Sequence, residues 1–137
     1  MIETLHLFRP LNAKLLDLLR SLSNDEWCRK TVAGNWTVKD VVAHLLDTNM
    51  RFISIYRDHA SLAPDRELNS YADVVAYLNE LNTDWVKAMK RVSGRQLIEL
   101  HESTHEDYIR GLESLDPQAP AMFSVAWAGE IVSTNWF

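Results

Sequence analysis

The chain has 137 residues, a net charge of −5 and a charged fraction of 24%, which suits a single soluble globular domain over residues 1–137. The acidic balance argues against nucleic acid and against an anionic membrane as partners, because both attract clustered Lys and Arg. Cys28 is the only cysteine and no apolar run approaches the roughly 18 residues of a spanning helix, so a cytoplasmic protein without disulfides is expected.

The first apolar stripe predicts a helix from about Thr4 or Pro10 to Ser21. Gly and Pro are scarce, with 4 of each, which favours long helices. The stripe repeats every three to four residues. It is formed by Leu11, Leu15, Leu18 and Leu22, and it is widened by Leu16 and Leu19. Residues 23–26 interrupt the pattern, and Trp27 is expected to be buried in the connection.

The clearest helix start in the sequence is at Thr37. Thr37 is a good N-cap, Asp40 is spaced to complete a capping box, and Trp36 can fold onto the first turn as a hydrophobic staple. The predicted helix runs from about residue 38 to residue 58. Its expected inner face consists of Val41, His44, Leu45, Thr48, Phe52, Ile55 and His59.

Two more helices are predicted downstream, near residues 70–92 and from Arg95 to Ser114. The tail from Ala121 to Phe137 is strongly apolar. Amphipathic helices joined by short loops pack most simply as an up-and-down bundle, in which each stripe is buried against its neighbours. The fold class expected from this pattern is therefore all-α.

His44 is the candidate functional residue of the predicted helix at 38–58. It lies about two turns after the cap, on the apolar side of the helix. One interpretation is a core or half-buried histidine with a single hydrogen bond. The other is a metal ligand that projects into the bundle, with its second ring nitrogen held by a neighbouring group.

The segment from Trp36 to Leu45 resembles the second-helix signature of the DinB-like family of metal-binding four-helix bundles. The signature has Trp, then Ser or Thr, two residues, an acid, three residues and His-Leu. The segment is especially similar to the branch that includes the N-terminal domain of mycothiol-dependent maleylpyruvate isomerase. Weaker likeness extends over residues 18–27 and 112–130. The resemblance implies a DinB-like bundle for the whole chain.

The same resemblance implies a metal-dependent enzyme, such as a thiol-dependent transferase or isomerase that acts with a small-molecule thiol. His44 would be one ligand of a divalent zinc or nickel ion. The family's other two ligands lie one helical turn apart on the fourth helix, which should follow Asn135, Trp136 and Phe137. We therefore expect the last helix to be truncated or missing, and the metal to be absent or weakly bound in this form.

A rival motif is His101-Glu102-Ser103-Thr104-His105, which spells the H-E-x-x-H helix of zinc peptidases. It would make the protein a zinc hydrolase, with Glu102 as general base. No third ligand stands out, so the polar face of an amphipathic helix is the simpler interpretation. An intermediate possibility is that His101 or His105 faces the bundle interior.

A second function class is a non-catalytic helical module that dimerises or binds a partner. The apolar residues between Met122 and Phe137 favour it, because several Trp and Phe side chains need to be covered. The simplest cover is a second copy of the chain, which predicts a twofold homodimer.

Overall fold

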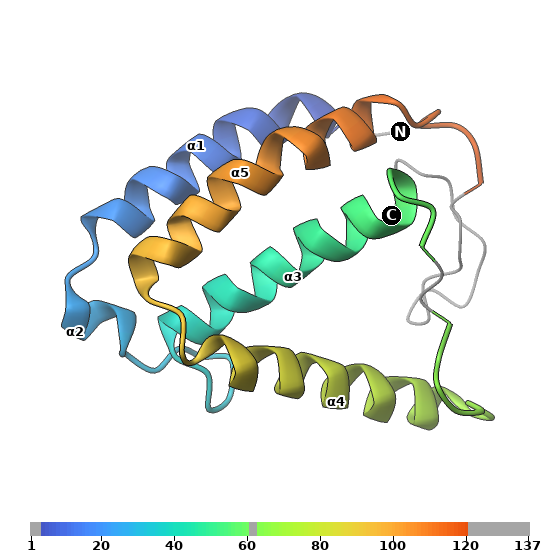
Figure 1. Cartoon of the computed structure of the whole chain (residues 1–137), viewed down its shortest axis with the longest axis horizontal. Coiled ribbons are helices and arrows are strands. Elements are labelled where there is room, and N and C mark those ends of the chain that lie inside the picture. The colour runs from blue at the N-terminus through green and yellow to red at the C-terminus, as the bar shows by residue number, and fades with distance from the viewer. Residues whose placement is uncertain (1–3, 61–62, 121–137) are drawn as a thin grey trace.

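The computed structural model describes residues 4–60 and 63–120. These residues form helices α1 (Leu5–Ser21), α2 (Asn24–Trp27), α3 (Val38–Tyr56), α4 (Tyr71–Met89) and α5 (Gly94–Glu113), drawn in Figure 1. Within the described ranges there is no strand, only an isolated antiparallel bridge between Lys30 and Thr37. The prediction of an all-α bundle is confirmed.

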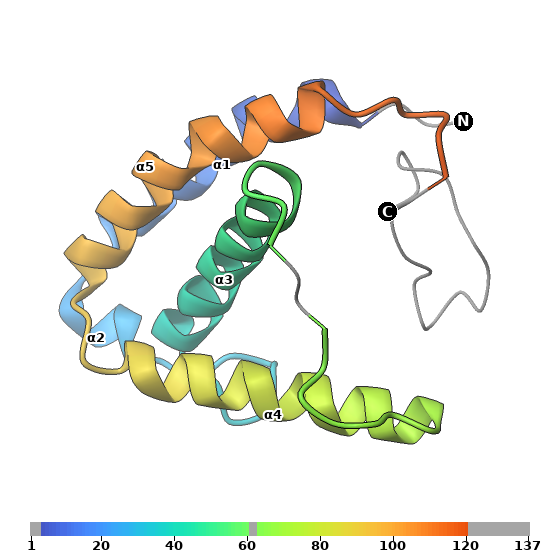
Figure 2. The same cartoon turned by 45° about the vertical axis from the view of Figure 1, so that its right-hand side comes forward.

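The long helices pack in the spatial order α1, α5, α3, α4. Figures 1 and 2 show α1 and α5 side by side, with α3 below them and α4 on the far side of α3. Successive long helices alternate in direction, as in an up-and-down bundle. However, α5 lies between α1 and α3, so helices that follow one another in sequence are not always the ones that pack together.

Serine and threonine caps fix the start of each helix from α2 to α5. The side chains of Ser23, Thr37, Ser70 and Ser93 each accept a hydrogen bond from the backbone N–H three residues later. Glu26 completes a capping box with Ser23. The predicted end of the first helix at Ser21 is confirmed, and the interruption at residues 23–26 consists of the Ser23 cap and the start of the separate short helix α2. Trp27 at its end is buried, as predicted.

The apolar core is built around the contact between α3 and α5. Its buried side chains are Leu16, Leu19, Trp27, Val42, Ala43, Leu46, Ile53, Val86, Leu97 and Ile109. The predicted inner face of α3 is displaced by one position, whereas on α1 the buried residues are Leu16 and Leu19, which were expected to widen the stripe. Leu11 and Leu18 are 60% and 58% exposed. Leu45 and Thr48 are also exposed, while Leu46 is completely buried.

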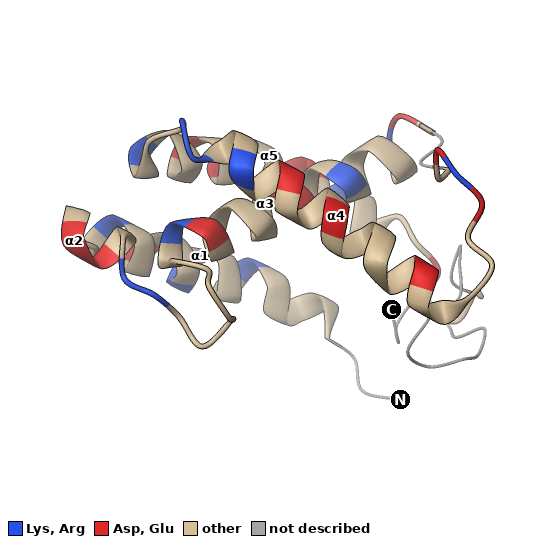
Figure 3. Cartoon of the chain, turned by 90° about the horizontal axis from the view of Figure 1, so that it is seen from below, with Lys and Arg blue, Asp and Glu red and all other residues tan. Residues whose placement is uncertain are grey.

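None of the described helices is long and apolar enough to cross a membrane. The apolar tail from Met122 to Phe137, on which the dimer prediction depends, lies outside the described residues. Figure 3 shows that positions of Lys and Arg and positions of Asp and Glu are interspersed along the described helices.

Candidate functional site

The loop before α3 is closed by backbone hydrogen bonds. The N–H of Val38 donates to the carbonyl of Arg29 at 2.9 Å, and the N–H of Thr31 donates to the carbonyl of Trp36 at 2.9 Å. Gly34 turns the chain with φ of 62°, in the left-handed region that favours glycine. These contacts hold Trp36 beside the first turns of α3.

The capping box predicted at the start of α3 is present. Thr37 Oγ1 accepts from the N–H of Asp40 at 3.3 Å, while Asp40 Oδ2 accepts from the N–H and the hydroxyl of Thr37 at 3.0 and 2.9 Å. The Asp40 side chain is buried. Because Oδ2 is committed to the cap, Asp40 serves as a structural anchor for the helix that carries His44.

The His44 imidazole is half-buried against the Trp36 indole. The two ring centroids are 5.1 Å apart and the ring planes meet at 53°. Nδ1 of His44 is buried and has no hydrogen-bond partner in the part of the chain that the structure describes. Leaving a buried polar atom unpaired costs about 1–3 kcal/mol. The expected single hydrogen bond of a structural histidine is therefore not made at this nitrogen.

A polar stripe continues along α3 from His44. Asp47 and Arg51 follow it at helical spacing, and the Arg51 Nε donates to Asp47 Oδ2 at 2.8 Å. These two residues line one side of a hollow of about 390 Å³ between α3 and α4. Its other lining residues are Leu78, Leu81, Asn82, Asp84, Trp85 and Ala88. Leu78 and Leu81 are 42% and 46% exposed, so this side of α4 lines a groove and is only partly buried.

Trp85 lines this groove and also links the two helices that form it. Its indole N–H donates to the carbonyl oxygen of Ala43 at 2.7 Å, which joins α4 to α3 in the interior. A buried indole normally finds such a partner, but the sequence does not indicate which carbonyl will accept. This hydrogen bond therefore fixes one aromatic residue in the lining of the groove.

The structure divides the H-E-x-x-H motif between the core and the surface. His101 is 2% exposed and its Nε2 lies 2.9 Å from the carbonyl oxygen of Val42. A carbonyl only accepts, so this nitrogen carries its proton there and has no lone pair for a metal. Burial lowers the pKa of His101, which favours the neutral ring. The intermediate possibility, an inward-facing His101, is confirmed.

The other two residues of the motif are less buried than His101. Glu102 is exposed and pairs with Arg20 of α1. His105 is half-buried, and its pKa is lowered first by burial and then by the charge of Arg9. The motif lies on one helix as predicted, but its side chains do not converge on a common point, so the geometry argues against a zinc hydrolase.

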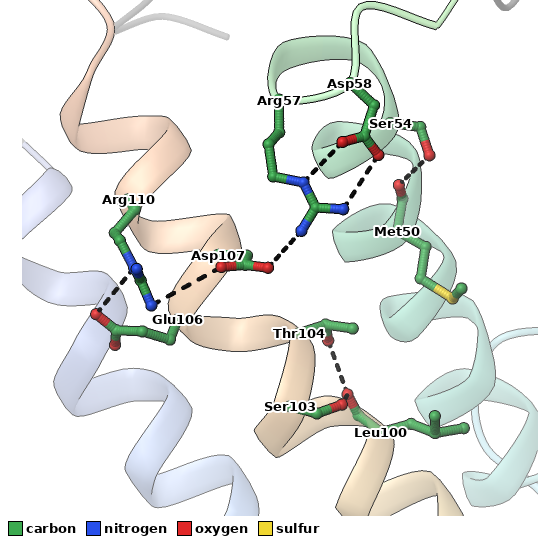
Figure 4. A network of polar contacts seen from close by, with 10 residues as sticks. All are labelled: Met50, Ser54, Arg57, Asp58, Leu100, Ser103, Thr104, Glu106, Asp107 and Arg110. Atoms are coloured by element: carbon green, nitrogen blue, oxygen red, sulfur yellow. Dashed lines mark hydrogen bonds and ion pairs between the residues drawn. The ribbon is translucent and has the colours of Figure 1, made fainter.

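Acidic residues of α5 near the C-terminal end of α3 form ion pairs with arginines. Figure 4 shows Arg57 of α3 bridging to Asp107 of α5, with Arg110 reaching Glu106 and Asp107. Arg9 of α1 binds Glu106 at 2.7 Å and holds the pKa of that carboxyl below its usual range. The pairs are largely exposed and contribute modestly to stability. They align α1, α3 and α5 rather than forming a metal site.

No group of three His, Cys, Asp or Glu side chains within residues 4–60 and 63–120 is placed to hold a metal ion together. The two further ligands that the family resemblance implies are not found in these ranges. Cys28 is an exposed free thiol, and His59 is exposed near the end of α3. Of the candidate residues, His44 alone has a buried ring nitrogen without a hydrogen-bond partner among the described residues.

A bundle of amphipathic helices with a capped, histidine-bearing second long helix defines the class of protein. A family model, the mycothiol maleylpyruvate isomerase N-terminal domain, matches residues 8–136. The chain belongs to this family, as the segment around His44 indicated. Comparisons with curated proteins and with solved structures gave no match.

Proposed function

We propose that the protein is a metal-dependent enzyme of the maleylpyruvate isomerase type, with His44 as one ligand of a divalent zinc or nickel ion. The observation that supports this most directly is the buried Nδ1 of His44, which has no partner among the described residues. A neutral imidazole is the commonest metal ligand in proteins. An ion bound to Nδ1 would remove the free-energy cost of leaving this atom unpaired.

The other residues near His44 fit a supporting role. Asp40 and Thr37 fix the start of the helix, so the position of His44 relative to the loop is rigid. The Trp36 ring lies against the imidazole, with 5.1 Å between the two ring centroids. When bound, a divalent metal lowers the pKa of a coordinated thiol or water and supplies a nucleophile at neutral pH.

One histidine does not complete a catalytic metal site, which normally has three protein ligands. The described residues supply His44, and further donors have to come from outside these ranges or from a second chain. Without those donors, His44 would bind the ion weakly. The family description names a thiol cofactor, and a small-molecule thiol is the proposed substrate class.

Metal titration of purified variants tests this function. Zn²⁺ or Ni²⁺ is titrated against a competing chromogenic chelator with the unmodified chain, His44→Ala and His59→Ala. His59 is exposed and serves as the matched control. We expect His44→Ala to abolish the binding that His59→Ala retains. Equal binding by all three proteins would reject His44 as a ligand.

A second candidate function is a non-catalytic dimerisation module. Its support is the set of large apolar side chains left exposed, which includes Leu11 and Leu18 of α1 and Leu78 and Leu81 of α4. Exposed apolar surface of this kind often marks an interface. Sedimentation at micromolar concentration should show a dimer that Leu11→Glu/Leu18→Glu dissociates. A monomeric unmodified chain would exclude this function.

A further inference from the structure

We propose that Trp36 is a positioning residue for His44, whose indole holds the imidazole in the orientation needed for a ligand. The inference deepens the proposed function and rests on it. It assigns to Trp36 a role toward the site, in place of the expected packing on the first helical turn alone.

The ring contact limits how the imidazole can turn. The torsion about the Cβ–Cγ bond of histidine is broad, so the plane of the imidazole can tilt over a wide range unless a neighbour prevents it. The indole lies with its centroid 5.1 Å from the imidazole and tilted by 53°. Tilted aromatic pairs of this kind are favourable beyond simple burial. One face of the ring is therefore occupied.

Trp36 is itself held from both sides. Its carbonyl accepts from the N–H and the hydroxyl of Thr31, at 2.9 and 3.0 Å, and its own N–H donates to the carbonyl of Ala33 at 3.2 Å. The following residue, Thr37, is bound into the helix cap. The loop thus fixes the backbone of Trp36 before the indole meets the imidazole.

The position of Trp36 is not explained by the core. The buried cluster contains Trp27, and Trp85 packs against it, but Trp36 is half-buried outside that cluster. The Trp36 ring instead contacts the ring of His44. Groups that orient a metal ligand typically change metal affinity about 10- to 100-fold when they are removed.

The first test uses the metal-free chain. In NMR spectra we expect cross-relaxation between the Trp36 indole and His44 imidazole protons, and upfield ring-current shifts of the imidazole that Trp36→Ala removes. Val32→Ala is the matched control, since Val32 is exposed in the same loop. Absence of the cross-relaxation in the unmodified chain would overturn the proposal whether or not any metal binds.

The second test is Zn²⁺ affinity, measured by competition with a chelator. Trp36→Ala should weaken binding by about tenfold or more. Trp36→Phe, which keeps an aromatic ring, should recover most of the loss, and Val32→Ala should match the unmodified chain. Should Trp36→Ala fail to fold, Trp36→Leu retains apolar bulk without the ring and should show the same weakening.

The outcomes separate the two proposals. If His44→Ala loses metal while Trp36→Ala and Trp36→Leu bind as tightly as the unmodified chain, the positioning role is wrong and the proposed function stands. If His44→Ala binds metal normally, the proposed function is wrong, and with it the ligand role that Trp36 would support.

Discussion

Nε2 of His101 lies 2.9 Å from the carbonyl oxygen of Val42, and this contact joins α5 to α3 inside the bundle. The Val42 carbonyl belongs to a helix, so the imidazole adds a second donor to an acceptor already in the backbone ladder. A neutral ring with its proton on Nε2 satisfies this geometry. The histidine is therefore part of the core, and its titration is coupled to folding.

Acid should destabilise the fold through His101. Burial lowers its pKa from the ordinary value near 6.5, so the unfolded chain binds this proton more readily than the folded chain. The stability from the neutral ring is fully present above about pH 6.5 and is lost as the pH falls below it. Urea unfolding at pH 7.5 and 5.5 should show a lower midpoint at pH 5.5.

The matched variant is His101→Gln, whose amide N–H can still donate to Val42 and does not titrate. It should lose less stability between pH 7.5 and 5.5 than the unmodified chain. The stability of this variant should still depend on pH to some extent, because burial also lowers the pKa of His105. An equal loss of stability between pH 7.5 and 5.5 in both proteins would show that His101 does not cause the acid destabilisation.

The H-E-x-x-H motif should be dispensable for metal binding. His101→Gln combined with His105→Ala should leave the Zn²⁺ affinity within about twofold of the unmodified chain, because Nε2 of His101 is committed to Val42 and Glu102 to Arg20. The measurement is the same chelator competition used for His44. Loss of stoichiometric zinc in the double variant would restore the hydrolase interpretation.

The sequence predicted the helices well and their buried faces poorly. The helix from Arg95 to Ser114 and the cap at Thr37 are confirmed almost to the residue, because serine, threonine and glycine mark helix ends chemically. The face of α3 was displaced because apolar residues come in adjacent pairs such as Leu45-Leu46. Periodicity cannot choose between the members of a pair; the position of α5 decides.

The candidate site was predictable only in part. His44 and its capped helix were identified from the spacing and from the family likeness. The contact between Trp36 and His44 depends on how the loop closes, and the pairing of His101 with Val42 depends on the crossing of α5 over α3. Both are tertiary features with no local signature.

Leu46 and Leu45 offer a direct test of the observed face of α3. Leu46 is 0% exposed and Leu45 is 40% exposed. Leu46→Ala should lower the free energy of unfolding by about 2–5 kcal/mol, because it leaves a cavity in the core. Leu45→Ala should cost less than about 1 kcal/mol. Urea unfolding of both variants measures the difference, and a larger loss for Leu45→Ala would mean that the originally predicted face is the buried one.

Gly111 in α5 should not tolerate alanine, although alanine is the better helix former by about 1 kcal/mol. A Cβ at this position would lie 2.6 Å from Cε1 of Phe52. The Phe52 ring has little freedom to move away, because it stacks on Tyr56 at 4.3 Å and meets the edge of Tyr108 at 4.8 Å. Overpacking typically costs about 1–3 kcal/mol, so Gly111→Ala should be net destabilising.

The two opposing effects on Gly111 can be separated with a smaller partner at position 52. In a Phe52→Leu background the clash with Cβ is relieved, and the helix propensity of alanine should then dominate. Gly111→Ala should therefore lower the urea midpoint of the unmodified chain and leave unchanged or raise that of Phe52→Leu. A loss of the same size in both backgrounds would show that the contact between α3 and α5 is looser here than its geometry indicates.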